Sequence, residues 1–277
     1  MKYLKPLFIS AFVALVFISS AYGVWLAQTG DRNGWAVLAA AAVPALFFGW
    51  LFIAKPARTS AHPWWLMLGG VIGLSVLNTS AAGYESALLL IGLCGFLGPQ
   101  LYIQWYSRFA DRESNRLATG AVMPALNLRT TEGRTVTTTE FFAGRTLWLF
   151  YRGNWCPVCV AQVRELAAHY RELEKRGVKV LMISPQSASA SARLATSVSA
   201  PMTFLQDSNN DLARALGIVD ETGLPMGLQA LGYDSAAPMP TVILTEGGKI
   251  VWRDLTDNYR LRPEPDVFLK VLDGELP

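Results

Sequence analysis

Two cysteines three positions apart are the residues of this sequence best suited to chemistry. Cys156 and Cys159 follow an apolar run, Thr146 to Tyr151, and flank the start of a stretch with helical periodicity at Pro157. Side chains three positions apart on a helix face the same way, so the two sulfurs can come within disulfide range. Proline suits the first turn of a helix, where unpaired N–H groups stabilise a thiolate. The spacing therefore predicts a redox-active dithiol at a helix N-terminus.

Two other uses of this pair fit the sequence less well. A zinc site needs two more ligands, and the candidates are Cys94 in an apolar stretch, His62 in a distant loop and His169 on a different helix face. A purely structural disulfide gains little from closing so short a loop. We therefore expect neither a metal nor a cofactor.

Hydrophobic residues make up 52% of the 277 residues and are concentrated before residue 107. Four stretches there are almost free of charge, and each is long enough to cross the hydrocarbon core of a bilayer as a helix. They cover about residues 7–27, 35–54, 64–82 and 86–106. The sequence predicts an all-α membrane domain over 1–107, a linker over 108–120 and a second domain over 121–277, with the lipid bilayer as a partner.

Lysines and arginines gather on one side of these four spans, whereas the other side has only Arg32, balanced by Asp31. The basic residues of the first side are Lys2, Lys5, Lys55, Arg58, Arg108, Arg112 and Arg116. The positive-inside rule then predicts a protein of the bacterial inner membrane with a cytoplasmic C-terminal domain. Alternatively, residues 2–23 form a cleaved signal peptide, which leaves three spans and the same orientation. A net charge of +3 without a basic cluster predicts no nucleic-acid partner.

The second half alternates short apolar runs with helical patterns. Strands are expected near 125–129, 136–138, 146–151, 178–184, 202–205, 241–244 and 249–253, and helices near 157–176, 187–198, 211–216 and 263–272. This order predicts an α/β domain with a central mixed sheet and helices on both faces. The irregular segment 218–238, rich in Gly, Pro and Met, is expected to border a binding groove.

From about Gly120 to Leu276 the sequence resembles the thioredoxin-fold, peroxiredoxin-like proteins of the alkyl hydroperoxide reductase and thiol-specific antioxidant (AhpC/TSA) family. The resemblance rests on FYRGNWCPVC at 150–159, FLQDSNNDLARALGI at 204–218 and MPTVILTEGGKIVWRDLTDNYRLRPEP at 239–265. It implies a thioredoxin-like fold and an antioxidant oxidoreductase. The first motif resembles two branches of this fold, which differ in the sulfur that attacks.

In the thioredoxin-like interpretation, Trp155 to Cys159 matches the Trp-Cys-x-x-Cys site, which makes Cys156 the nucleophile and Cys159 the resolving thiol. Pro240 then resembles the cis-proline that faces the dithiol in that fold. We take this interpretation, a membrane-anchored thiol-disulfide oxidoreductase, as the main prediction. Its partner is a thiol reductant or a protein disulfide, and Trp155, Pro157, Pro240 and Arg152 are the predicted substrate-binding residues.

In the peroxiredoxin-like interpretation, Cys159 is the peroxidatic thiol of an enzyme that reduces hydroperoxides. The sequence departs from the family pattern twice, because Arg152 replaces the proline of its Phe-Tyr-Pro and Cys156 replaces a threonine that hydrogen-bonds peroxide. No equivalent of the family's later arginine is evident near Met239. Arg152 is either a source of positive charge for a thiolate or a solvated loop residue. The remaining cysteine, Cys94, is expected to be a small packing residue.

Overall fold

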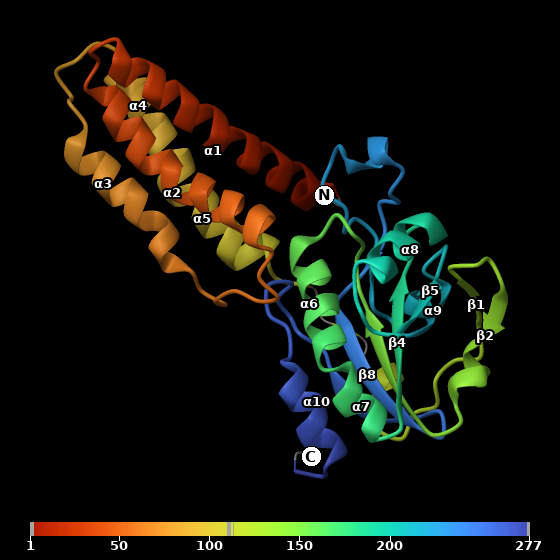
Figure 1. Cartoon of the computed structure of the whole chain (residues 1–277). Helices are drawn as coiled ribbons and strands as arrows, with labels where there is room; N and C mark the ends of the chain where they lie inside the picture. Colours follow the sequence, from red (N-terminus) through yellow and green to blue (C-terminus); the bar gives the residue numbers. More distant parts are fainter. Residues whose placement is uncertain (1–2, 110–111, 113, 276–277) are drawn as a thin grey trace. The chain divides into compact units, whose positions relative to one another are not determined.

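The computed structural model describes residues 3–109, 112 and 114–275, which form two compact units (Figure 1). Unit 1 comprises residues 1–55, 59–108 and 225–227, and unit 2 comprises residues 56–58, 109–224 and 228–277. Lys2 and part of the predicted 108–120 linker lie outside the described residues.

Unit 1 contains three helices that are long and apolar enough to cross a membrane. They are α1 (Leu4–Gln28), α2 (Asn33–Ala54) and the continuous helix Tyr84–Tyr106, which consists of α4 (Tyr84–Ile91), η2 (Gly92–Leu97), α5 (Gly98–Leu101) and η3 (Tyr102–Tyr106). Large apolar side chains point outward from them, and Leu46 and Ile53 of α2 are 72% and 85% exposed. Such a surface requires an apolar environment, so these helices indicate membrane association.

The prediction of a fourth long helix over 64–82 is wrong. Helical structure there is confined to η1 (Trp64–Met67) and α3 (Leu68–Val76), and the backbone is already extended at Leu77. At about 1.5 Å per residue this helix falls short of the roughly 30 Å hydrocarbon core. Glycines bring its backbone against neighbouring helices, since a Cβ on Gly69 would lie 2.4 Å from the carbonyl oxygen of Ala39. Close packing of this kind is typical of membrane helices.

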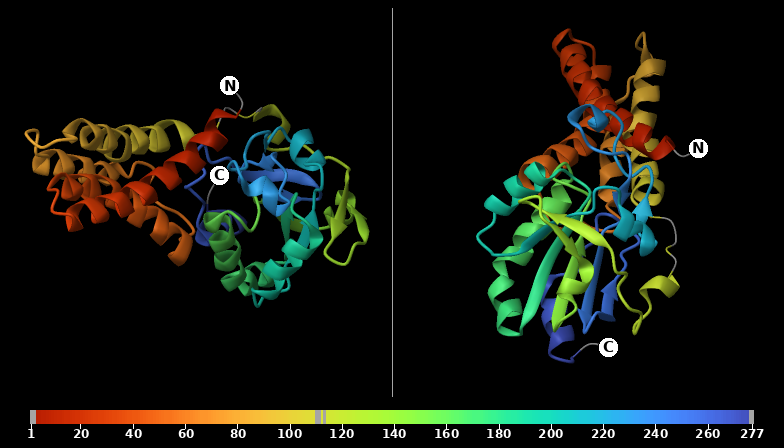
Figure 2. Two further views of the ribbon diagram at one scale, coloured as in Figure 1. Left: turned by 90° about the horizontal axis from the view of Figure 1, so that it is seen from above. Right: turned by 90° about the vertical axis from the view of Figure 1, so that its right-hand side faces the viewer.

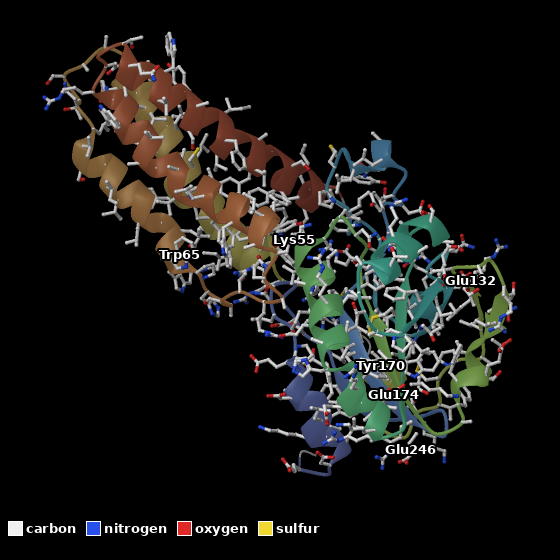
Figure 3. The ribbon with its side chains drawn as sticks, in the orientation of Figure 1. Lys55, Trp65, Glu132, Tyr170, Glu174 and Glu246 are labelled. Carbon is white, nitrogen blue, oxygen red and sulfur yellow. The ribbon has the colours of Figure 1, made fainter. Side chains whose placement is uncertain are left out.

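The segment from Trp65 to Asn78 nevertheless packs along α2. The ring of Trp65 lies 5.7 Å from that of Phe47 in the second half of α2, and Figure 3 labels Trp65 and Lys55 toward the same end of the helices. At the start of α2, the Asn33 side-chain amide donates to the carbonyl of Asn78 (3.3 Å) and accepts from its N–H (2.9 Å). Between α2 and α4 the chain therefore runs back along α2 from the level of Phe47 to that of Asn33.

Unit 2 is built on a seven-stranded mixed sheet with the order β2-β1-β5-β4-β3-β8-β9. Its strands are β1 (Asn127–Thr130), β2 (Thr135–Thr137), β3 (Arg145–Phe150), β4 (Val178–Ser184), β5 (Thr203–Gln206), β8 (Thr241–Glu246) and β9 (Lys249–Asp254). Its helices are α6 (Pro157–Ala168), α7 (Tyr170–Lys175), α8 (Ala188–Thr196), α9 (Asp211–Ala215) and α10 (Pro265–Leu272), with short 3-10 turns η4 (Ser114–Leu117), η5 (Thr138–Phe141) and η6 (Leu228–Leu231). Two further short strands, β6 (Val219–Asp220) and β7 (Ala237–Pro238), pair with each other.

Strand β3 is the centre of this sheet, parallel to β4 and antiparallel to β8. Its side chains alternate between the faces, and Trp148 and Phe150 join the main core with Leu212 and Leu216 from the region of α9. Helices α6 and α7 lie across the other face, and Figure 2 shows the sheet between these two layers. The predicted fold, a mixed sheet with helices on both faces of a thioredoxin-like domain, is confirmed.

The helix predicted over 157–176 is interrupted once. His169 leaves the helical conformation at φ −97° and ψ 4°, and its ring Nδ1 hydrogen-bonds the carbonyl of Glu165 at 2.9 Å. The break separates α6 from α7 and changes nothing at the N-terminus of α6, where the two cysteines lie.

Candidate active site

The two cysteines lie at the junction of β3 and α6. The N–H of Tyr151 still donates to the carbonyl of Ile183 at 2.9 Å, so the loop that carries the dithiol leaves the sheet only after this residue. Cys156 is the N-cap of α6, Pro157 is its first residue and Cys159 lies two residues further on. The N–H of Cys159 donates to the carbonyl of Cys156 at 3.1 Å. The helix therefore starts at Pro157, as the sequence predicts.

Both cysteines are buried and free, and each acts on the pKa of the other. Burial raises the pKa of Cys159, but the hydrogen bond from Cys156, the charges of Arg262 and Arg152 and the N–H of Arg152 together lower it to about 6. Burial and the neighbouring Cys159 raise the pKa of Cys156 well above its ordinary value. The pair therefore divides into a thiolate at Cys159 and a thiol donor at Cys156.

Arg262 is a site residue that the sequence analysis missed. It lies after β9, is 6% exposed, and its Nη2 donates to Sγ of Cys159 at 4.0 Å. It belongs to the third family-like motif, but only the return of the chain after β9 brings it back to α6. An arginine beside a thiolate stabilises its negative charge. Because the guanidinium stays protonated, this effect does not depend on pH in the physiological range.

A second arginine, Arg152, is buried in the loop before the dithiol and is not a solvated loop residue. It donates to the carbonyl of Gly223, and its guanidinium lies 4.8 Å from the ring centre of Trp155 and 5.9 Å from that of Tyr259. Arg152 thus binds together three segments of unit 2 while its charge acts on both cysteines. Trp155 is half-buried and covers this guanidinium.

Gln186, at the end of β4, organises the loop between β3 and α6. Its amide nitrogen donates to the hydroxyl of Tyr151 (3.0 Å), to Asn154 (3.1 Å) and to Ser191 (3.2 Å), and its oxygen accepts from the N–H of Asn154 (2.8 Å). Burial, partly opposed by hydrogen bonds from Ser191, Gln186 and Ser184, raises the pKa of Tyr151 to about 12. Tyr151 is therefore a neutral donor or acceptor under physiological conditions.

Pro240 does not have the conformation expected of it. The described residues contain no cis peptide bond, so the bond between Met239 and Pro240 is trans, and the predicted cis-proline is wrong. Pro240 is buried directly before β8, where an X-Pro bond with ordinary extended backbone suffices to enter the strand.

A pocket of about 250 Å³ lies beyond the carboxyl ends of the parallel strands. Arg152 and Trp155 form one wall, Gln186 and Gln206 another, and Tyr233 and Asp234 come from the irregular segment 218–238. That segment therefore does border a groove, as its composition predicts. Across residues 3–109, 112 and 114–275, no three His, Cys, Asp or Glu side chains gather in a metal-binding cluster.

Comparisons with known proteins agree with this geometry. Residues 119–253 match the AhpC/TSA family model. The chain is 31% identical over 158 residues to peroxiredoxin Bcp of Escherichia coli, covering 57% of this chain and 97% of that protein. It is 25% identical over 200 residues to chloroplastic peroxiredoxin Q of Sedum lineare, covering 72% of this chain and 98% of the relative.

A solved structure supports the fold. The crystal structure of reduced Prx3 from Vibrio vulnificus in complex with H2O2 superposes with a TM-score of 0.50 and 16% identity, over 56% of this chain and 98% of that one. The sequence match to Bcp covers nearly the whole of that relative, and the residues that match the family model, 119–253, include both cysteines. The chain therefore belongs to the peroxiredoxins of the AhpC/TSA family, which are thiol peroxidases and hence oxidoreductases.

Proposed function

We propose that this protein is a membrane-anchored thiol peroxidase in which Cys159 is the peroxidatic nucleophile. The observation that carries the proposal is the contact between Arg262 and Cys159, because it places a fixed positive charge against one sulfur of the pair. The lowered pKa of Cys159 beside the raised pKa of Cys156 supports the same assignment. Family membership also favours the peroxidase over the disulfide reductase as the principal activity.

The reaction begins with the Cys159 thiolate attacking the terminal oxygen of a hydroperoxide. The O–O bond breaks, the alkoxide leaves and takes up a proton as the alcohol, and Cys159 becomes a sulfenic acid. Negative charge moves from sulfur onto the two oxygens during this step. Arg262 and the amides at the start of α6 are suited to stabilise this charge in a buried site.

Which cysteine attacks peroxide depends on which of the two sulfurs is ionised. The raised pKa keeps Cys156 protonated at neutral pH, so it is the weaker nucleophile of the two. The roles in the main sequence interpretation, with Cys156 attacking, are therefore exchanged in this proposal. Trp155 and Arg152 line the pocket beside the loop that carries the dithiol, and Pro157 starts the helix.

The experiment is peroxide consumption by the full-length protein in detergent, with H2O2 and with a bulky organic hydroperoxide. Cys159→Ser should abolish the rapid reaction with both substrates. Cys94→Ser is the matched control, since Cys94 is a buried cysteine of unit 1 outside the site, and it should react at the wild-type rate. Rapid oxidation that survives in Cys159→Ser and disappears in Cys156→Ser would overturn the assignment.

We also propose that the catalytic unit is cytoplasmic. Within unit 1, the ring of Phe8 near the start of α1 lies 5.6 Å from that of Trp105 near the end of the last helix, and Lys5 donates to the carbonyl of Arg108. The start of α1 and the end of the last long helix, Tyr84–Tyr106, therefore lie on the same side of unit 1. Lys55, at the end of α2, is assigned to this side as well. The positive-inside rule assigns this side to the cytoplasm. A reporter fused after the last residue should be active in the cytoplasm, and periplasmic activity would refute the orientation.

A further inference from the structure

The loop that follows β9 carries Arg262 to Cys159. β9 ends at Asp254, and Thr241 at the start of β8 pairs with Phe150 at the end of β3. This loop therefore leaves the sheet at the edge from which the dithiol loop also departs. Because the sheet ends before Arg262, the position of this arginine depends on what holds the loop.

The side chain of Arg262 has few contacts that fix it in place. Its hydrogen bonds go to the carbonyl of the preceding Leu261 and to Sγ of Cys159, and its buried Nε makes none within the described part of the chain. Arg58 donates to the backbone carbonyl of Arg262 at 3.2 Å and holds that end of the loop. The path of the loop backbone thus sets where the guanidinium of Arg262 meets Cys159.

Arg112 holds the other end of this loop. Its Nη1 donates to Oγ1 of Thr241 at 3.2 Å, and its Nη2 donates to the backbone carbonyl of Thr256, two residues after β9. The hydroxyl of Thr241 in turn donates to the carbonyl of Met239 at 2.9 Å. The planar guanidinium presents these two donors in a fixed geometry, so Arg112 ties the loop to the first residue of β8.

Phe109 makes a second contact with the same loop. Its N–H donates to the carbonyl of Asp257 at 2.7 Å, and its ring centre lies 5.5 Å from the guanidinium carbon of Arg112. Phe109 and Arg112 belong to the predicted 108–120 linker, and both lie outside residues 119–253, which match the family model. Arg262 lies outside that match as well. The contact of this segment with the loop is therefore a feature of this chain beyond the matched region.

We infer that Arg112 is a positioning residue of the peroxidatic site, which holds the loop after β9 so that Arg262 stays against Cys159. This inference rests on the proposed function, because it takes Cys159 as the reacting thiol. Arg112 acts through the loop backbone, and its own hydrogen bonds go to Thr241 and Thr256. The segment that precedes the family-matched domain is then part of the scaffold of the site as well as a tether.

Arg112 also carries a charge, and its effect must be separated from that of position. Burial lowers the pKa of Arg112 to about 10, and the charge of Asp254 opposes this change, so the guanidinium is still protonated at neutral pH. A cation near the site favours a thiolate from any orientation. Lysine retains the charge but cannot present two donors in the geometry of a guanidinium. Arg112→Lys therefore tests position, and Arg112→Met removes position and charge together.

The measurement is the pH dependence of the reaction with H2O2 in the full-length protein in detergent. The wild type should reach half of its maximal rate near the Cys159 pKa of about 6. In Arg112→Met the midpoint should move toward about 8.5, the ordinary value for cysteine, and the rate at pH 7 should fall about tenfold. This is a smaller loss than the roughly 10²-fold expected when a donor to the reacting charge is itself removed. Arg112→Lys should resemble Arg112→Met.

Arg116→Met is the matched control from the same linker. Nη1 of Arg116 donates to the carbonyls of Arg214 (3.2 Å) and Ala215 (3.3 Å) in α9, away from the loop after β9. This variant loses the same charge and two contacts with backbone carbonyls, and its midpoint should stay near the wild-type value. Thermal unfolding in the same detergent checks that each variant is folded.

A milder pair of variants covers the case in which Arg112→Met does not fold. Thr241→Val removes the hydroxyl that accepts from Arg112 and leaves the loop carbonyl as its remaining acceptor, whereas Thr241→Ser keeps the hydroxyl. The valine variant should shift the midpoint in the same direction as Arg112→Met by a smaller amount. The serine variant should titrate like the wild type.

The outcomes distinguish this inference from the proposed function. A wild-type midpoint in folded Arg112→Met, or complete recovery by Arg112→Lys, overturns the positioning role while Cys159 remains the peroxidatic thiol. An equal shift in Arg116→Met also overturns it, because the overall charge of the linker is then the cause. A rapid reaction that persists in Cys159→Ser and is lost in Cys156→Ser overturns the proposed function itself.

Discussion

The guanidinium of Arg262 lies 4.0 Å from Sγ of Cys159, although the two residues are 103 positions apart in the chain. Arg262 follows the last strand of the sheet, and Cys159 lies in the first turn of α6. Burial alone would raise the pKa of Cys159, but the hydrogen bond from Cys156 and then the charge of Arg262 lower it, so Cys159 is the more acidic member of the pair. The contact of Arg262 with Cys159 is the relationship from which the other expectations about this site follow.

Replacing Arg262 with Met should raise the pKa of Cys159 and slow the reaction with H2O2 at neutral pH by roughly 10²-fold, the usual effect of removing one donor from a developing charge. The measurement is the second-order rate constant from rapid-mixing fluorescence. Arg129→Met removes the same charge from an exposed position on β1 and is the control. A loss of rate shared by both variants would point to the overall charge of the protein and away from Arg262.

The rate of the peroxide reaction should depend on pH through the thiolate of Cys159. Its pKa of about 6 predicts a rate constant that rises as the pH passes this value and is nearly level above about pH 7. A half-maximal rate near pH 8.5, the ordinary value for cysteine, would show that the site does not acidify this thiol. Thiolate absorbance in the ultraviolet, compared between the wild type and Cys159→Ser, gives the same pKa independently.

The same shift predicts how the stability of unit 2 changes with pH. Cys159 is a thiolate in the folded state between about pH 6 and its ordinary value near 8.5, whereas in the unfolded state it is still protonated there. The unfolded state therefore binds more protons, and the free energy of unfolding should rise with pH across this window. Cys156, whose pKa is raised, stays protonated in both states over the same range and adds no slope. Thermal midpoints from pH 6 to 8.5 test this, with Cys159→Ser as the variant that should lose the slope.

Much of unit 2 is predictable from the sequence because its elements are local. The apolar runs that become β3 and β4, the Gly247–Gly248 turn between β8 and β9 and the helix start at Pro157 all depend on neighbouring residues. Arg262 is not predictable in this way, since its role depends on a contact across 103 positions. The length of α3 also depends on packing, because an apolar composition does not reveal that Leu77 leaves the helix.

Loss of Arg152 should mainly lower the stability of unit 2, whereas loss of Arg262 should mainly raise the pKa of Cys159. Arg152→Met removes the donor to the Gly223 carbonyl and the cation beside two rings, so we expect unit 2 to lose about 1–3 kcal/mol of stability. Its effect on the pKa of Cys159 should be smaller than that of Arg262→Met, because Arg262 exerts the larger of the two charge effects. Thermal unfolding and the pH dependence of the peroxide reaction measure the two quantities. The reverse order, with Arg152 dominating the pKa, would contradict this division.

Gly153→Ala should distort the loop before the dithiol. A Cβ at Gly153 would lie 2.8 Å from Nε1 of Trp155, and its φ of +144° is one that side chains rarely adopt. Gly133, in the turn between β1 and β2, also has positive φ, +87°, but nothing lies within 4 Å of its Cβ position. Gly133→Ala therefore carries the backbone cost alone, about 1–2 kcal/mol. We expect Gly153→Ala to be less stable than this control and to react more slowly with peroxide, because Trp155 must move away from Arg152. Equal thermal midpoints and wild-type peroxide rates in both variants would show that Trp155 has room to shift and does not position the arginine.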